Sequence, residues 1–298
     1  MNNSGEILEH ILQNDIPSPE PLTFSFLAPN LKGLDGANAI LARNRSAFET
    51  ETQRIVSQAE RLEQKISAAG VPGGPFKPAL EIAVFAAATE SFSQKNLNCS
   101  IATSLERFSQ VIQAAKEEDL RVRAYISVVL GCPFEGHDVN PHRVAEIATD
   151  LLEMGADEIA LGDTTGMGTA PRTKELLNCL RSAGILNEDV AMHFHDTYGQ
   201  ALVNTAVALE HGIRTFDSSV GGLGGCPYSP GASGNVATED MVYFLESLGM
   251  DTGVDLDAVA DIGAWITGEV GKPHDSNVGK AVLAARRRSE QEGRRVSI

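Results

Sequence analysis

The segment AMHFHDTYGQ, residues 191–200, contains a His-X-His pattern. Side chains two residues apart in an extended strand point to the same face, so His193 and His195 could bind one metal ion. A strand histidine is more often a structural residue, and His-X-His alone is weak evidence. The turn residues Asp196 to Gly199 follow, which places the histidines near the C-terminal end of the strand. In a parallel barrel that end is the active face.

A glycine-rich run, VGGLGGCPYSPGASGN, covers residues 220–235. It places the thiol of Cys226 and the amide of Asn235 on a loop whose backbone can approach a ligand closely. A free cysteine is ordinarily a small buried hydrophobe. The density of glycine around Cys226 favours a functional thiol instead. With the two histidines, this loop predicts a divalent-metal lyase.

Composition limits the classes of function. The chain has 298 residues, 42% of them hydrophobic, which is enough for a large core. Its net charge of −16 argues against a nucleic-acid surface and against an anionic membrane surface. It does not exclude an anionic substrate, because a metal and a few local donors can invert the field inside a pocket. No apolar run reaches the roughly 18 to 20 residues of a membrane helix.

The cysteines and the start of the sequence bear on the compartment. The four cysteines are widely spaced, which favours a reduced intracellular environment. The opening MNNSGEILEHILQND contains acids and no arginine, unlike a signal peptide or a mitochondrial presequence.

Short β-rich runs alternate with amphipathic helical ones. This rhythm predicts βα units and a parallel sheet, most simply a TIM (β/α)8-type barrel forming one domain over residues 1–298. There are seven strand candidates, one fewer than the barrel needs, and the weakest is the last: 23–28, 81–87, 121–130, 158–162, 190–195, 215–219 and 234–237.

Two segments stand outside this rhythm. Residues 36–78 carry no strand signal and are interpreted as a helical insertion, with apolar residues at Ile55, Ala59, Leu62 and Ile66. Their spacing of 4, 3 and 4 suits one buried stripe, so a helix packed on the barrel is favoured over a regulatory or partner-binding insertion. Residues 272–298 form a basic C-terminal tail, interpreted as a solvated helix end.

Several long runs resemble one family of enzymes. AVFAAATESFSQKNLNCS, SVVLGCPFEG, LGDTTGMGT, HFHDTYGQALVNT and DSSVGGLGGCPYSPGASGNVATEDMVY are similar to 3-hydroxy-3-methylglutaryl-CoA lyase, with a shorter echo in FLAPNLKGL. The resemblance implies a metal-dependent barrel that cleaves this acyl-CoA to acetyl-CoA and acetoacetate in leucine breakdown and ketone-body formation. It also implies a homodimer in the mitochondrial matrix, with the cytosol as the alternative.

The resemblance assigns roles residue by residue. His193, His195 and Asn235 match the family's ligands for Mg²⁺ or Mn²⁺, and Cys226 matches its catalytic acid. Asp163 and Thr164 match a substrate-binding turn, whose alternative is helix capping. Asn96 and Ser100 match residues near the acyl-CoA, or are polar loop groups facing water. Asp217 and Glu239 are possible partners of these groups.

One family motif is missing. The family's first strand carries an adjacent Arg-Asp pair, in which the aspartate binds the metal and the arginine stabilises the enolate oxygen, and this sequence contains no Arg-Asp pair. Three interpretations follow. The chain is a truncated, alternatively spliced or imperfectly predicted product of a normal lyase, or it is a divergent enzyme that recruits Glu81, Glu90 or Asp163 as ligand. The third is a non-catalytic CoA-binding homologue. A related acyl-CoA-condensing synthase is a further alternative, which the loop cysteine disfavours.

Overall fold

The computed structural model describes residues 3–14, 16, 18, 21–66, 77–225 and 234–292. Six strands form one sheet, and strands that are neighbours in the sequence are neighbours in the sheet. In chain order, the strands are β1 Thr23–Leu27, β2 Ala79–Ala87, β3 Arg121–Ser127, β4 Glu158–Asp163, β5 Val190–Phe194 and β6 Thr215–Asp217.

The strands have the burial expected of a parallel sheet. Every residue of β4 is buried, and eight of the nine in β2 are, so both faces of these strands are covered. The β1–β2 pair is parallel, as is β5–β6, in which His193 is the register partner of Asp217. That register brings a carboxylate beside the His-X-His pattern.

The chain divides into two compact units. The first comprises Met1–Ala86, Leu97–Tyr125 and Ala148–Ile159. Its helix α1 (Ser4–Gln13) packs on α2 (Leu31–Arg43), and α2 packs on α5 (Ile101–Glu117) through an apolar face that includes Leu34 and Leu41. Its helix α3 spans Glu51–Ile66.

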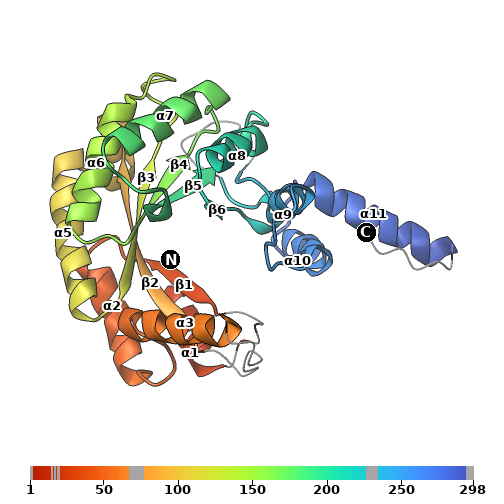
Figure 1. Cartoon of the computed structure of the whole chain (residues 1–298), viewed down its shortest axis with the longest axis horizontal. Helices are drawn as coiled ribbons and strands as arrows, with labels where there is room; N and C mark the ends of the chain where they lie inside the picture. Colours follow the sequence, from red (N-terminus) through yellow and green to blue (C-terminus); the bar gives the residue numbers. More distant parts are fainter. Residues whose placement is uncertain are drawn as a thin grey trace. The chain divides into compact units, whose positions relative to one another are not determined.

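The second unit comprises Ala87–Asn96, Ile126–Ile147 and Ala160–Ile298. Helix α7 packs on α8, and α9, α10 and α11 pack on one another, as Figure 1 shows. The bounds are α7 Ala170–Ser182, α8 Ala201–Glu210, α9 Thr238–Ser247, α10 Leu256–Glu269 and α11 Asn277–Glu292, with short 3-10 turns at Asn187–Asp189 and Val220–Gly222. Helices α4 (Glu90–Leu97) and α6 (Pro141–Glu153) each contribute residues to both units.

Two strand predictions need correction. The strand predicted over 121–130 ends at Ser127, because Val128 has φ +58° and cannot continue an extended strand. The seventh candidate, 234–237, forms isolated bridges from Asn235 to His195 and from Ala237 to Ser219. Both bridges use only single residues, so no seventh strand forms in the part of the chain that is described.

The segment 36–78 contains the end of α2 and the whole of α3. The buried stripe predicted on α3 is wrong for its first members, because Ile55 is 55% exposed and Ala59 is also exposed. The side chains of Leu62 and Ile66 lie outside the described residues. Polar contacts at its first turn connect α3 to the unit instead, since Thr52 Oγ1 donates to Asp119 at 2.9 Å and Glu51 lies 3.9 Å from Arg121 of β3.

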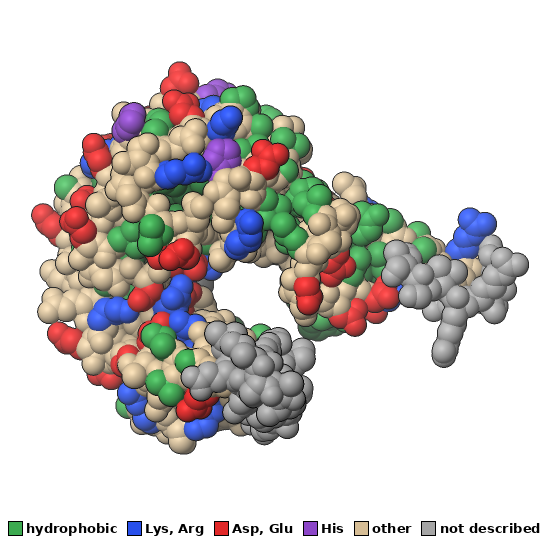
Figure 2. Space-filling view, in the orientation of Figure 1, with side chains coloured by type: hydrophobic (Ala, Val, Ile, Leu, Met, Phe, Trp, Pro, Cys, Tyr) green, Lys and Arg blue, Asp and Glu red, His purple; other side chains and the backbone are tan. Residues whose placement is uncertain are grey.

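The C-terminal segment is helical as far as Glu292. Arg286 lies 2.5 Å from Asp257 and 2.8 Å from Asp261, both on α10, so this arginine of the basic run pairs within the unit. Arg294 and Arg295 lie outside the described residues. On the face shown in Figure 2, acidic and basic side chains are interspersed.

Candidate active site

The two histidines of the pattern lie on one face at the end of β5. Nε2 of His193 is 3.3 Å from Nε2 of His195, and Nδ1 of His193 is 3.1 Å from Oδ2 of Asp217. A carboxylate beside Nδ1 favours a proton on that nitrogen, which leaves Nε2 with a free lone pair. The Nε2 atoms of His193 and His195 therefore point toward the same position.

His195 is held in its neutral form. It is only 5% exposed, and burial, with a smaller contribution from the neighbouring His193, lowers its pKa from 6.5 to about 4. An imidazole must be deprotonated at the ligating nitrogen to bind a metal. His195 is thus ready to act as a ligand at neutral pH.

Asn235 lies next to His195 through the isolated bridge between the two backbones. Its Nδ2 donates to the carbonyl of Leu223 at 2.9 Å, and its Oδ1 is buried without a hydrogen-bond partner among the described residues. A buried, unsatisfied amide oxygen is costly, and a bound cation would satisfy it. The amide is therefore oriented with its oxygen available.

These donors fit part of a divalent-metal site. Two nitrogens about 2.1 Å from an octahedral ion stand about 3.0 Å apart when adjacent, close to the 3.3 Å between the histidine Nε2 atoms. Two imidazoles and an amide oxygen form a neutral donor set. Within the described residues, no group of three or more His, Cys, Asp or Glu side chains could hold a metal. No carboxylate ligand is therefore identified beside the histidines.

The glycine segment 220–225 leads from this site toward Cys226. Both carboxylate oxygens of Glu239 accept a hydrogen bond from the amide of Gly221, each at 3.0 Å, and Glu239 is fully buried. Cys226 itself lies outside the described residues, and its role stays a prediction. Sequence analysis gave no role to His274, whose Nε2 lies 3.3 Å from Oε1 of Glu239.

Asp163 ends β4, Thr164 follows it, and both support neighbouring backbone. Oδ2 of Asp163 accepts from the amide of Gly168 at 2.9 Å, while its Oδ1 is buried and has no hydrogen-bond partner within the described part of the chain. Burial raises the pKa of Asp163 to about 6. Thr164 Oγ1 accepts from the amide of Val128 at 2.9 Å. Both residues hold turns at the carboxyl ends of strands, where substrate contacts form in barrels.

The remaining predicted residues have local contacts. Ser100 is the N-cap of α5, and its Oγ accepts from the amide of Thr103 at 3.2 Å, a capping role that the sequence analysis did not assign to this residue. Asn96 lies exposed on α4. Of the possible substitute carboxylates, Glu81 is engaged by Arg121 at 2.8 Å.

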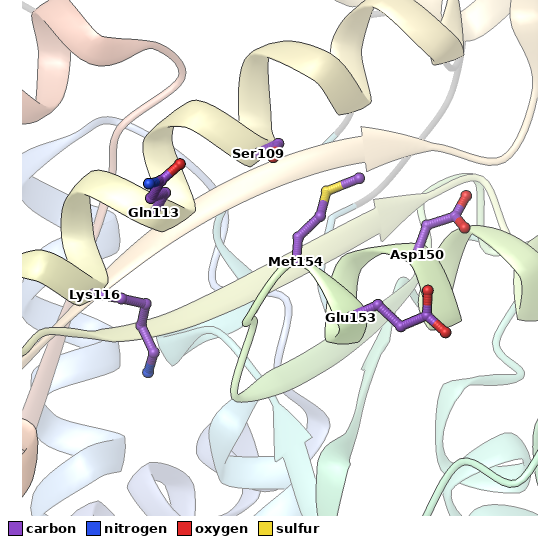
Figure 3. A pocket seen from close by; sticks show the side chains of 6 residues that line it. All are labelled: Ser109, Gln113, Lys116, Asp150, Glu153 and Met154. Carbon is purple, nitrogen blue, oxygen red and sulfur yellow. The ribbon is translucent and has the colours of Figure 1, made fainter.

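A surface hollow of about 520 Å³ lies in the first unit between α5 and the end of α6. Its lining side chains, shown in Figure 3, point in different directions and do not converge on one position. Lys116 of this lining is engaged by Asp157 at 2.7 Å. The hollow therefore lacks the converging donors found at His193 and His195.

Comparisons with known proteins point to one family. The family model HMGL-like matches residues 44–266. The 3-hydroxy-3-isohexenylglutaryl-CoA/hydroxy-methylglutaryl-CoA lyase of Pseudomonas aeruginosa is 46% identical, over 95% of this chain and 80% of the relative. A cytoplasmic 3-hydroxy-3-methylglutaryl-CoA lyase of Rattus norvegicus is 51% identical, over 70% of this chain and 60% of the relative.

Solved structures agree. The crystal structure of hydroxymethylglutaryl-CoA lyase from Pseudomonas aeruginosa matches with a TM-score of 0.77 and 44% identity, covering 96% of this chain and 80% of that one. A lyase from Acinetobacter baumannii in complex with coenzyme A and 3-methylmalate matches with a TM-score of 0.72 and 26% identity, covering 99% and 79%.

The parallel sheet, together with the family match and the solved lyase structures, defines an α/β protein of the TIM-barrel class, as predicted from the sequence. The chain belongs to the HMGL-like family.

Proposed function

We propose that this chain is a carbon-carbon lyase that cleaves 3-hydroxy-3-methylglutaryl-CoA to acetyl-CoA and acetoacetate. The observation that carries the proposal is the pair of Nε2 atoms of His193 and His195, which face each other at 3.3 Å beside the available amide oxygen of Asn235. Relatives named as lyases of this substrate, at 46% and 51% identity, support it.

The reaction is a retro-Claisen cleavage. A base takes the proton of the tertiary hydroxyl, the electrons of that O–H bond form the ketone of acetoacetate, and the adjacent carbon-carbon bond breaks. Its electron pair passes to the enolate of the acetyl-CoA thioester, and an acid then protonates the enolate carbon. The site must therefore hold the hydroxyl and carboxylate oxygens and supply one proton.

His193, His195 and Asn235 would hold Mg²⁺ or Mn²⁺, which supplies Lewis-acid polarisation of the substrate oxygens when bound. Asp217 fixes the ring of His193 through Nδ1. We assign the protonating thiol to Cys226, because an ordinary thiol, with a pKa of about 8.5, is largely protonated at neutral pH. Asp163, Thr164, Asn96 and Ser100 are proposed to contact the acyl-CoA.

The compartment and the metabolic role of this activity are also proposals. Named relatives include cytoplasmic and mitochondrial lyases, which supports a role in leucine breakdown and ketone-body formation in either compartment. No helix among the described residues is long and apolar enough to cross a membrane. Cell fractionation would locate the chain, and light scattering would test the proposed homodimer.

The direct test is release of acetoacetate by the purified chain, with and without Mg²⁺ or Mn²⁺. The name of the Pseudomonas aeruginosa relative supports a second substrate, 3-hydroxy-3-isohexenylglutaryl-CoA, for comparison. Loss of product on chelation and in His193→Ala is expected. Release that persists after both changes would contradict the proposed metal site, and a folded chain that releases no product would contradict the lyase function and favour the non-catalytic CoA-binding alternative.

A further inference from the structure

The side chain of His274 lies in the connection between α10 and α11 and is 13% exposed. Its Nε2 is 3.3 Å from Oε1 of Glu239, which belongs to α9 and is fully buried. Neither ring nitrogen makes an aligned hydrogen bond with another described residue. The contact is therefore a close approach of the imidazole to the carboxylate rather than an aligned hydrogen bond.

Two glycines leave the space that this pair occupies. A Cβ at position 263, on α10, would collide with Oε1 of Glu239 and lie 2.6 Å from Nε2 of His274. A Cβ at position 279, on α11, would lie 3.0 Å from the same nitrogen. Both helices are thus shaped around the imidazole and the carboxylate, in a packed environment where a change of one methyl group is felt.

The same pair reaches the glycine segment 220–225. The amide of Gly221 donates to both oxygens of Glu239 at 3.0 Å, and its carbonyl accepts from the amide of Asp275, the residue after His274, at 3.0 Å. Gly221 has φ +65°, a left-handed conformation that these contacts hold in place. Two residues further on, the carbonyl of Leu223 accepts from Asn235.

A fully buried carboxylate is costly unless a positive partner and hydrogen-bond donors compensate it. Among the described residues, the amide of Gly221 donates to Glu239 and the imidazole of His274 approaches it. Without the imidazole, the carboxylate would be driven toward water or toward other donors. Either movement would release Gly221 and displace the start of the segment that continues, in the sequence, to Cys226.

We propose that His274 is a positioning residue: through its contact with Glu239, it fixes Gly221 and thereby sets the path of segment 220–225, which holds Asn235 through the carbonyl of Leu223 and precedes Cys226 in the sequence. The catalytic consequence rests on the proposed function above, whereas the anchoring of Gly221 does not. Because the segment leads to the proposed acid, loss of the anchor should slow the chemical step and leave binding of the acyl-CoA unchanged.

The test compares His274→Leu, which keeps bulk but removes the polar nitrogens, with His274→Gln, which restores a polar donor. His211→Leu is the matched control, because His211 is half-buried at the end of α8 and, among the described residues, its Nδ1 contacts the carbonyl of Val207 in its own helix. Two quantities are measured on the full chain: amide hydrogen exchange of the peptide containing Gly221, and kcat and KM for 3-hydroxy-3-methylglutaryl-CoA with Mn²⁺.

In His274→Leu, exchange at Gly221 should accelerate about tenfold or more and kcat should fall about tenfold with KM unchanged. His274→Gln should recover part of both, and His211→Leu should alter neither. Unchanged exchange, exchange that accelerates throughout the chain, or an unchanged kcat would each overturn the proposal. Amide hydrogen exchange does not require turnover of the substrate. A wild-type chain that cleaves nothing would therefore refute the proposed function, while the exchange rate would still decide whether His274 anchors Gly221.

Discussion

The side chains at the end of β5 form a chain of contacts that would prepare the proposed cation site. Asp217 orients His193, burial keeps His195 neutral, and the carbonyl of Leu223 orients Asn235. Each contact controls which donor atom is left available. The site therefore depends on residues that would not themselves touch an ion.

The contact between Asp217 and His193 can be tested by metal binding. In Asp217→Asn, Mn²⁺ affinity measured by calorimetry should fall about 10- to 100-fold, because the histidine loses the carboxylate that fixes its ring and raises its basicity. Asp251→Asn, an exposed residue outside the site, makes the same change in charge and should bind as the native chain does. Equal affinity in all three chains would show that Asp217 does not support the ligand.

Asp163 should impose a pH dependence on stability. Its pKa is raised to about 6 by burial, so between its ordinary pKa of 3.8 and about 6 the folded chain binds more protons than the unfolded one. Stability from this group is fully present below that window and is lost as pH rises through it. The Tm of Asp163→Asn relative to the native chain should therefore increase from about pH 4 to pH 7. A difference in Tm that is constant across this range, or that decreases, would contradict the assignment.

At the scale of the secondary-structure elements, the backbone that follows β3 depends on the hydroxyl of Thr164. Val128 is in the left-handed region, unfavourable for a β-branched residue, and its amide is satisfied by Thr164 Oγ1. In Thr164→Val, the free energy of unfolding in urea should fall by about 1–3 kcal/mol, because a part-buried amide loses its acceptor. Thr164→Ser should retain most of it. Equal losses in the two variants would contradict the role of the hydroxyl, because serine keeps it and valine does not.

The sequence predicted the order of the strands and helices better than it predicted which residues cover each element. Alternating βα runs identify the six strands because period and turn residues are local signals. The apolar spacing on α3 also predicts a face, but periodicity does not say what covers it, and Ile55 is exposed. Val128 carries no sequence signal for its positive φ, since the acceptor of its amide is Thr164, a residue distant in the sequence that follows β4.

The contacts of the candidate site also divide into those that the sequence predicts and those that it does not. His193 and His195 are brought together because strand geometry fixes the direction of residues two apart. The pairing of Asp217 with His193 requires the register of two strands, and the pairing of Glu239 with His274 requires the packing of α9 against α10 and α11. Such long-range contacts follow from tertiary structure, which the pattern of one segment does not encode.

For the molecule as a whole, the decisive feature is the missing Arg-Asp pair. The family resemblance assigns to that pair an anionic metal ligand and a group that stabilises the enolate, and the described residues offer two histidines and an amide instead. Lyase activity should therefore be low. A chimera with a first strand bearing Arg-Asp should be about 10²- to 10³-fold faster, the effect of one group that stabilises charge in the transition state. Cys226→Ala should abolish the gain.

Instability has to be separated from chemistry in this comparison. The sheet has β1 and β6 at its two ends, and unpaired edges promote aggregation. Both chains are therefore checked by size-exclusion chromatography and thermal unfolding before kcat is measured, and only the monodisperse, folded fractions are compared. If the native chain turns over 3-hydroxy-3-methylglutaryl-CoA at a rate near that of the chimera, the Arg-Asp pair is dispensable, and another carboxylate completes the metal site.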